Sequence, residues 1–162
     1  MKVIRSALLG AAALSTISMG TSFAAEKPVN LSLVTPISIA KETDSVTAFR
    51  FSLLYGKNTS VEVLDLGLVG HTTSGVSKGL QWNFVNIAEA DFKGLQAAAV
   101  NYNEGSFEGV QWGFVNHTMN GDGLQLGVVN YAKKYHGLQI GLVNIISQDG
   151  FLPVFPIVNW SF

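Results

Sequence analysis

A short motif recurs along most of the chain, and it limits the possible folds more than any other feature of the sequence. The units read VLDLGLVG, GLQWNFVN, GLQAAAVN, GVQWGFVN, GLQLGVVN and GLQIGLVN, and a degenerate seventh unit reads LPVFPIVN. Their starts lie 14 to 16 residues apart, which leaves no room for a crossover helix between units. The units occupy residues 63–70, 79–86, 94–101, 109–116, 123–130, 137–144 and 152–159.

Within a unit, large apolar residues alternate with small or polar ones. Leu80, Trp82 and Phe84 hold the second, fourth and sixth positions of one unit, while Gln and usually Gly hold the third and fifth. A period of two places the two sets on opposite sides of an extended strand, whereas a helix would scatter them around its axis. The alternation therefore predicts strands with an apolar face that includes Trp82, Phe84, Trp112, Phe114, Leu126 and Ile140.

The segments between units are rich in Asn, Asp, Gly, Ser and Lys, which are turn residues. Residues 46–55 alternate in the same way, and residues 30–40 contain one more expected strand. Together with the units, this gives about nine strands.

Glutamines and asparagines form two rows that run through the units. One interpretation is functional, because such rows can line a sugar or peptide groove or a polar lumen. The structural interpretation is favoured, because each side-chain amide can both donate and accept hydrogen bonds in every repeat, whereas a ligand site normally breaks a repeat. The rows consist of Gln81, Gln96, Gln111, Gln125 and Gln139, and of Asn86, Asn101, Asn116, Asn130 and Asn144, with Asn159 in the degenerate unit.

Three closed architectures remove the apolar side of such strands from water. The leading expectation is an all-β antiparallel meander, closed as a small outer-membrane-type β-barrel with its apolar side toward lipid. The alternative is a parallel β-solenoid with one unit per coil, the apolar side inside and the amides stacked between coils. A soluble barrel or sandwich is the third.

The end of the chain favours the barrel, because alternating large residues lead to a terminal aromatic residue, Phe162. Arg50 and Asp65 fall on the glutamine side of neighbouring strands, where an ion pair inside a lumen would lie. The loops, however, are uniform in length, whereas bacterial barrels alternate short turns with longer external loops.

The N-terminus predicts export. Lys2 and Arg5 precede an apolar stretch over residues 7–14, and the triplet SFA then offers a cleavage site for signal peptidase. We expect a signal peptide at residues 1–24 and a single domain at residues 25–162. The chain contains no Cys, which excludes disulfides and thiolate chemistry, and its formal net charge of −1 makes nucleic acid a poor partner.

The four units GLQWNFVN, GVQWGFVN, GLQLGVVN and GLQIGLVN, with the closing FLPVFPIVNWSF, carry a family resemblance. Over residues 50–162 the chain resembles the bacterial surface-repeat proteins of the leptospiral type, which are built on tandem GLQxGxVN units. This resemblance implies export to the cell envelope or surface and no enzymatic activity, and it supplies no ligand residues.

No catalytic, cofactor-binding or metal-binding set can be named from the sequence. His71, His117 and His136 are the only histidines, and they are expected to be solvated loop residues. We therefore expect a non-enzymatic envelope or surface protein, structural or adhesive, with outer-membrane lipid as its partner. The alternative is a secreted or periplasmic solenoid that binds a glycan or a protein.

Overall fold

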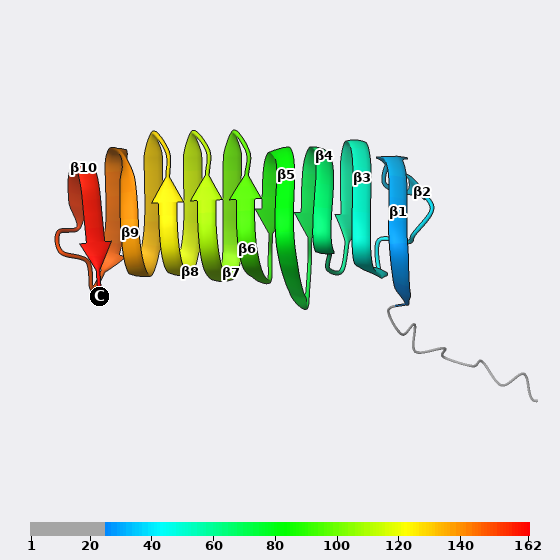
Figure 1. Cartoon of the computed structure of the whole chain (residues 1–162), viewed down its shortest axis with the longest axis horizontal. Coiled ribbons are helices and arrows are strands. Elements are labelled where there is room, and N and C mark those ends of the chain that lie inside the picture. The colour runs from blue at the N-terminus through cyan, green and yellow to red at the C-terminus, as the bar shows by residue number, and fades with distance from the viewer. Residues whose placement is uncertain (1–24) are drawn as a thin grey trace, which may run out of the picture.

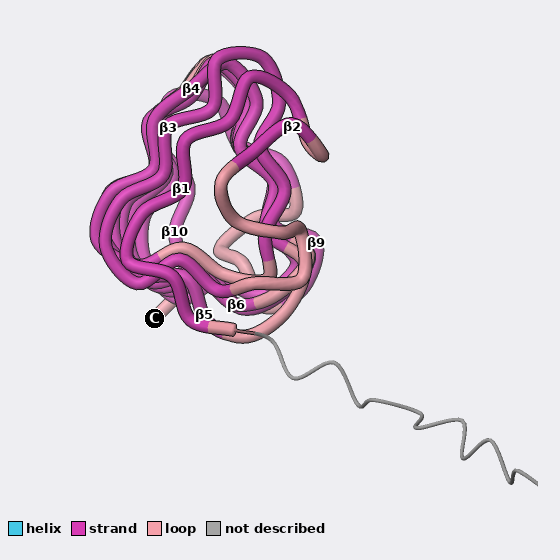
Figure 2. Tube along the Cα trace, turned by 90° about the vertical axis from the view of Figure 1, so that its right-hand side faces the viewer, coloured by secondary structure: helices cyan, strands magenta, loops and turns pink. Residues whose placement is uncertain are grey.

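The protein is a parallel β-solenoid in the computed structural model, which describes residues 25–162. Its strands lie side by side along the long axis of the molecule (Figure 1). Seen along that axis, successive coils superimpose around a common interior (Figure 2). The predicted signal peptide at residues 1–24 lies outside the described residues.

Ten strands form one sheet, in the order β10-β9-β8-β7-β6-β5-β4-β3-β1-β2. Most neighbours along this order are parallel; only β2 on β1 and β10 on β9 are antiparallel. The strands are β1 (Glu26–Val34), β2 (Ile37–Ser38), β3 (Ser45–Asn58), β4 (Glu62–Thr72), β5 (Val76–Ala88), β6 (Asp91–Ala97), β7 (Val100–Trp112), β8 (Val115–Leu126), β9 (Val129–Gln148) and β10 (Val154–Ser161).

The parallel pairing corrects the leading expectation from the sequence. An antiparallel meander would place successive units in opposite directions, but here they run in the same direction. Each unit stacks in register on the next, so that Asn101 pairs with Asn116 and Asn116 with Asn130. The antiparallel outer-membrane barrel is therefore wrong, and the solenoid alternative describes the backbone.

The interior of the solenoid corrects a second expectation. The solenoid alternative placed the large apolar residues of each unit inside, yet Trp82 and Trp112 are 63% and 64% exposed, while Gln111 and Asn116 are completely buried. The polar side of each unit faces inward because its amides bond to one another between coils. Apolar side chains, among them Phe92, Phe107, Tyr135 and Ile146, contribute other buried parts of the interior.

The glycine that opens each of the five units within residues 79–144 is required by close stacking. Gly109 has φ of +137°, and a Cβ there would lie 2.0 Å from the carbonyl oxygen of Gly94 in the preceding coil. Positive φ strains residues with a side chain, and the backbone contact leaves no space for one. The recurring glycine thus lets neighbouring coils approach at this corner.

The two ends of the solenoid differ from its middle. At the N-terminal end, β2 folds back on β1. At the other end the degenerate unit 152–159 is not a further parallel coil, because β10 turns back antiparallel to β9. Its asparagine, Asn159, bonds to the backbone oxygen of Leu152 at 2.9 Å instead of extending the asparagine row.

Within residues 25–162, no helix is long and apolar enough to cross a membrane.

Candidate functional site

A ladder of buried glutamines runs through the interior. Each Nε2 donates to the Oε1 of the glutamine in the preceding coil. The bonds are Gln96 to Gln81 at 2.8 Å, Gln111 to Gln96 at 2.9 Å, Gln125 to Gln111 at 2.6 Å and Gln139 to Gln125 at 2.6 Å. Because every member is 0–2% exposed, this row cannot line an open groove.

A second ladder of asparagines runs beside it with the opposite donor direction. Each Nδ2 donates to the Oδ1 of the asparagine in the following coil, from Asn86 through Asn101, Asn116 and Asn130 to Asn144, at 2.7–2.8 Å. The same Nδ2 groups also donate to backbone oxygens, for example Asn116 to Leu126 at 2.9 Å. Both polar rows are thus occupied by internal hydrogen bonding.

An ion pair stands at the N-terminal end of the glutamine ladder. Arg50 Nε and Nη2 donate to the two carboxylate oxygens of Asp65 at 2.7 and 2.6 Å, and Gln81 Nε2 donates to Asp65 Oδ2 at 2.9 Å. Both charged side chains are buried. The structure thus joins the two residues that the sequence placed on the glutamine side of neighbouring strands.

The outer side of the units forms a continuous apolar face. We define it by two rows that flank the fifth residue of each unit. In one row each residue pairs with its equivalent in the next coil. In the other, backbone hydrogen bonds link Phe84, Ala99, Phe114 and Val128 of successive coils. The tryptophan row is Leu31, Phe51, Leu66, Trp82, Ala97, Trp112, Leu126 and Ile140; the phenylalanine row is Leu68, Phe84, Ala99, Phe114, Val128 and Leu142.

Neither row contains a charged side chain, and the indole N–H groups of Trp82 and Trp112 are the only side-chain hydrogen-bonding groups in them. Phe84, Phe114 and Leu142 are 61%, 66% and 69% exposed. The largest apolar patch on a typical monomer covers about 300–600 Å² and is often functional. A face that spans β1 to β9 without a polar interruption is therefore the strongest candidate for a binding surface.

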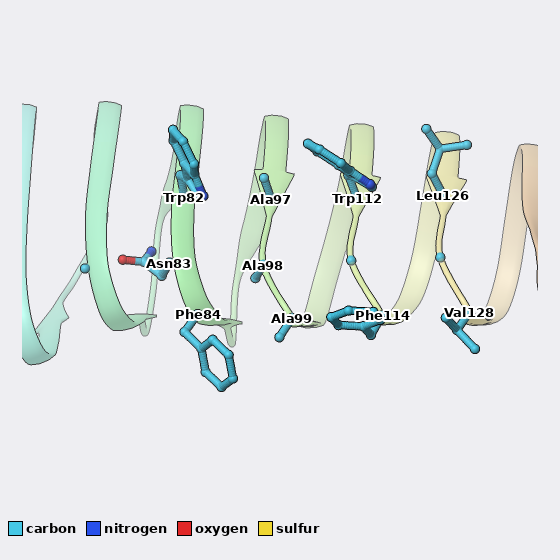
Figure 3. Close-up of a pocket in the computed structure, with 13 residues that line it drawn as sticks. Trp82, Asn83, Phe84, Ala97, Ala98, Ala99, Trp112, Phe114, Leu126 and Val128 are labelled. Atoms are coloured by element: carbon cyan, nitrogen blue, oxygen red, sulfur yellow. The ribbon is translucent and has the colours of Figure 1, made fainter.

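A groove of about 800 Å³ lies in the middle of this face. Figure 3 shows Trp82 and Trp112 on one side of the fifth residue, Phe84 and Phe114 on the other, and the alanines of residues 97–99 between them. We call the gap between the two aromatic pairs, floored by these alanines, the aromatic slot. Its walls are two coils apart, which is about 9.5 Å at the usual strand spacing.

A charged row borders the apolar face beyond the recurring glycine. Its members pair in register from Glu62 through Lys78, Lys93, Glu108 and Asp122 to His136. Lys93 Nζ lies 2.6 Å from a carboxylate oxygen of Glu108, and this exposed hydrogen bond raises the pKa of Lys93. The charges thus lie beside the apolar face and leave it uninterrupted.

The histidines were expected to be solvated loop residues, but all three lie in strands, and only His136 is exposed. His117 lies in β8 and stacks between Tyr102 and Tyr131, with ring centroids 4.6 and 4.9 Å apart. Burial lowers the pKa of its imidazole. His71 bonds through Nδ1 to the Tyr55 hydroxyl and through Nε2 to Glu89, both at 2.7 Å.

Over the described range, no three histidine, aspartate, glutamate or cysteine side chains come together as a metal site. His136 and Asp122 do approach, at 3.2 Å, as an exposed pair.

Sequence reasoning did not identify Ala97 and Ala99 as part of a site. The unit GLQAAAVN differs from its neighbours in having alanine where they carry Trp or Leu and Phe or Val. The small alanine side chains of this unit create the aromatic slot. The useful signal in the sequence was therefore the small side chain at two outward positions where the neighbouring units have large ones.

No protein-family model matches this sequence, and comparison with curated proteins and with solved structures found no match.

Proposed function

We propose that this protein is a non-enzymatic, exported binding protein of the bacterial cell envelope, and that the apolar face is its binding surface. The observation that carries the proposal is the exposure of Trp82, Phe84, Trp112 and Phe114 on one face of the sheet. Burying one such side chain contributes about 1.5–3 kcal/mol, so the exposed face favours association. Export rests on the N-terminal sequence pattern of residues 1–24.

The chemistry of the face favours a protein partner over a glycan. Sugar hydroxyls that lose water on binding need hydrogen-bond partners, because an unsatisfied polar group costs about 1–3 kcal/mol. The two rows offer only the indole N–H donors of Trp82 and Trp112 and no side-chain acceptor. The amides of the glutamine and asparagine ladders are buried and bonded to one another. An apolar protein surface needs no such partners.

Photocrosslinking in exporting cells tests this proposal. Benzoylphenylalanine in place of Leu142, on the apolar face, should form adducts with protein, whereas the same probe in place of Lys93, on the charged row, should not. Adding Trp112→Ser and Phe114→Ser should abolish the Leu142 adduct. Equal adducts at both positions, no protein adduct at Leu142, or adducts with lipid only would contradict the proposal.

A further inference from the structure

We infer that the protein partner of the apolar face is a second copy of this chain, docked face to face around the aromatic slot. This inference rests on the proposed function, because it names the partner of the same surface. It is carried by two observations: the area of the face, and the order of large and small side chains along it.

The area is sufficient for a stable dimer. Trp82, Phe84, Trp112 and Phe114 are each 61–66% exposed. Since an aromatic side chain buries about 150–250 Å², these four alone present on the order of 400–600 Å². The exposed aliphatic residues of the same rows, such as Leu68 and Leu142, extend the face toward the roughly 800 Å² per partner that a specific interface buries.

The order of side chains is self-complementary. In the tryptophan row Ala97 is the direct neighbour of Trp112, and in the phenylalanine row Ala99 is the neighbour of Phe114. A twofold axis between these two coils, parallel to the strands and lying in the interface, would place each Trp112 over the Ala97 of the other copy. The same rotation would place each Phe114 over Ala99, so that both slots are filled.

An axis along the solenoid, in place of one parallel to the strands, fills the slot less well. A twofold axis along the solenoid would set the coil of Ala97 against itself, leaving the slot empty, and would crowd the coil of Trp112 against itself. Symmetric dimers repeat one contact twice, so a large residue adjacent to a small one is the pattern that closes such an interface. The rows are uncharged, and therefore no like charges oppose each other across it.

A size-exchange experiment tests the dimer. We expect the exported chain, purified without denaturant, to have twice the monomer mass by light scattering. Ala97→Trp should weaken the dimer by at least about tenfold, because the new indole occupies the position of the partner's Trp112. Trp112→Ala should weaken it similarly, and the double variant A97W/W112A, which exchanges the large and small residues, should restore it to within a few fold.

The control is Lys93→Ala on the charged row, which should leave the dimer unchanged. Circular dichroism and urea midpoints should show that all variants are folded. The opposite result for Ala97→Trp, tighter association, would indicate nonspecific adhesion of apolar surfaces and overturn the inference. A monomeric wild-type chain that still forms face-dependent adducts with a different protein would also overturn it, while leaving the proposed function intact.

Discussion

Arg50 and Asp65 form a bidentate ion pair in the interior of the solenoid, and the carboxylate of Asp65 also accepts the terminal donor of the glutamine ladder. The buried ion pair is therefore hydrogen-bonded directly to the neutral glutamine ladder. Removing one charge leaves the other without compensation in a site that water does not reach.

Asp65→Asn should lower the free energy of unfolding by about 3–5 kcal/mol, because the buried guanidinium of Arg50 loses its counter-charge. Urea unfolding followed by circular dichroism measures the loss. The double variant R50M/D65N, which removes both charges, should be more stable than Asp65→Asn alone. A single variant as stable as the wild type would show that the pair contributes little.

The stability lost when a ladder glutamine is replaced should depend on its position in the ladder. Gln111 both donates to Gln96 and accepts from Gln125, so Gln111→Ala disrupts a bond on either side and should cost on the order of 2–5 kcal/mol. Gln139 ends the ladder, and within the described structure its Oε1 has no hydrogen-bond partner. Gln139→Ala should therefore cost less, about 1–3 kcal/mol. Equal losses in urea unfolding would argue against a cooperative ladder.

Two phenylalanines of one coil test which side of the strands faces the interior of the solenoid. Phe107 is 2% exposed and stacks on Phe92, whereas Phe114 is 66% exposed. Phe107→Ala should lower the free energy of unfolding by about 3–5 kcal/mol, and Phe114→Ala by less than about 1 kcal/mol, as is usual at the surface. Low protein concentration keeps association from adding to stability. The reverse order would mean that the apolar face is buried.

Stability should fall in mild acid because of His117. Burial lowers the pKa of this imidazole in the folded state, so the unfolded chain takes up its proton first as the pH falls below about 6.5. The contribution of His117 is complete above that pH and is lost progressively below it. His117→Tyr, which keeps a ring between Tyr102 and Tyr131, should be less sensitive between pH 7.5 and pH 5. Identical pH profiles for the two proteins would refute this assignment.

The sequence predicts that these segments are strands, but it does not predict whether neighbouring strands run parallel or antiparallel. Alternation of period two identified the side of Gln111 and Gln125 as distinct from the side of Trp112 and Leu126, and the structure keeps these sets apart. It could not distinguish parallel from antiparallel pairing, because both have the same period. The uniform length of the segments between units was the feature that pointed to coils, although the structure places much of these expected loops within strands such as β7 and β9.

The alternation of residues also could not show which side of the strands faces the interior of the solenoid. Burial of apolar residues is the general rule, and it favoured Trp82 and Phe84 inside a solenoid. That rule gives way here because Gln81 and its equivalents satisfy one another in every coil, so their burial leaves few polar groups without partners. The aromatic slot depended on Ala97 and Ala99, whose significance appears only when adjacent coils are aligned.

The opposite donor directions of the two amide ladders have an electrostatic consequence. The N–H groups of the glutamines point toward the coil of Asp65, and those of the asparagines point toward β10. Aligned amide dipoles add along a row, so two rows of opposite polarity largely cancel along the axis. Lengthening the molecule by another coil would therefore add little net field along the axis, so the electrostatic cost of ending the interior depends little on the number of coils.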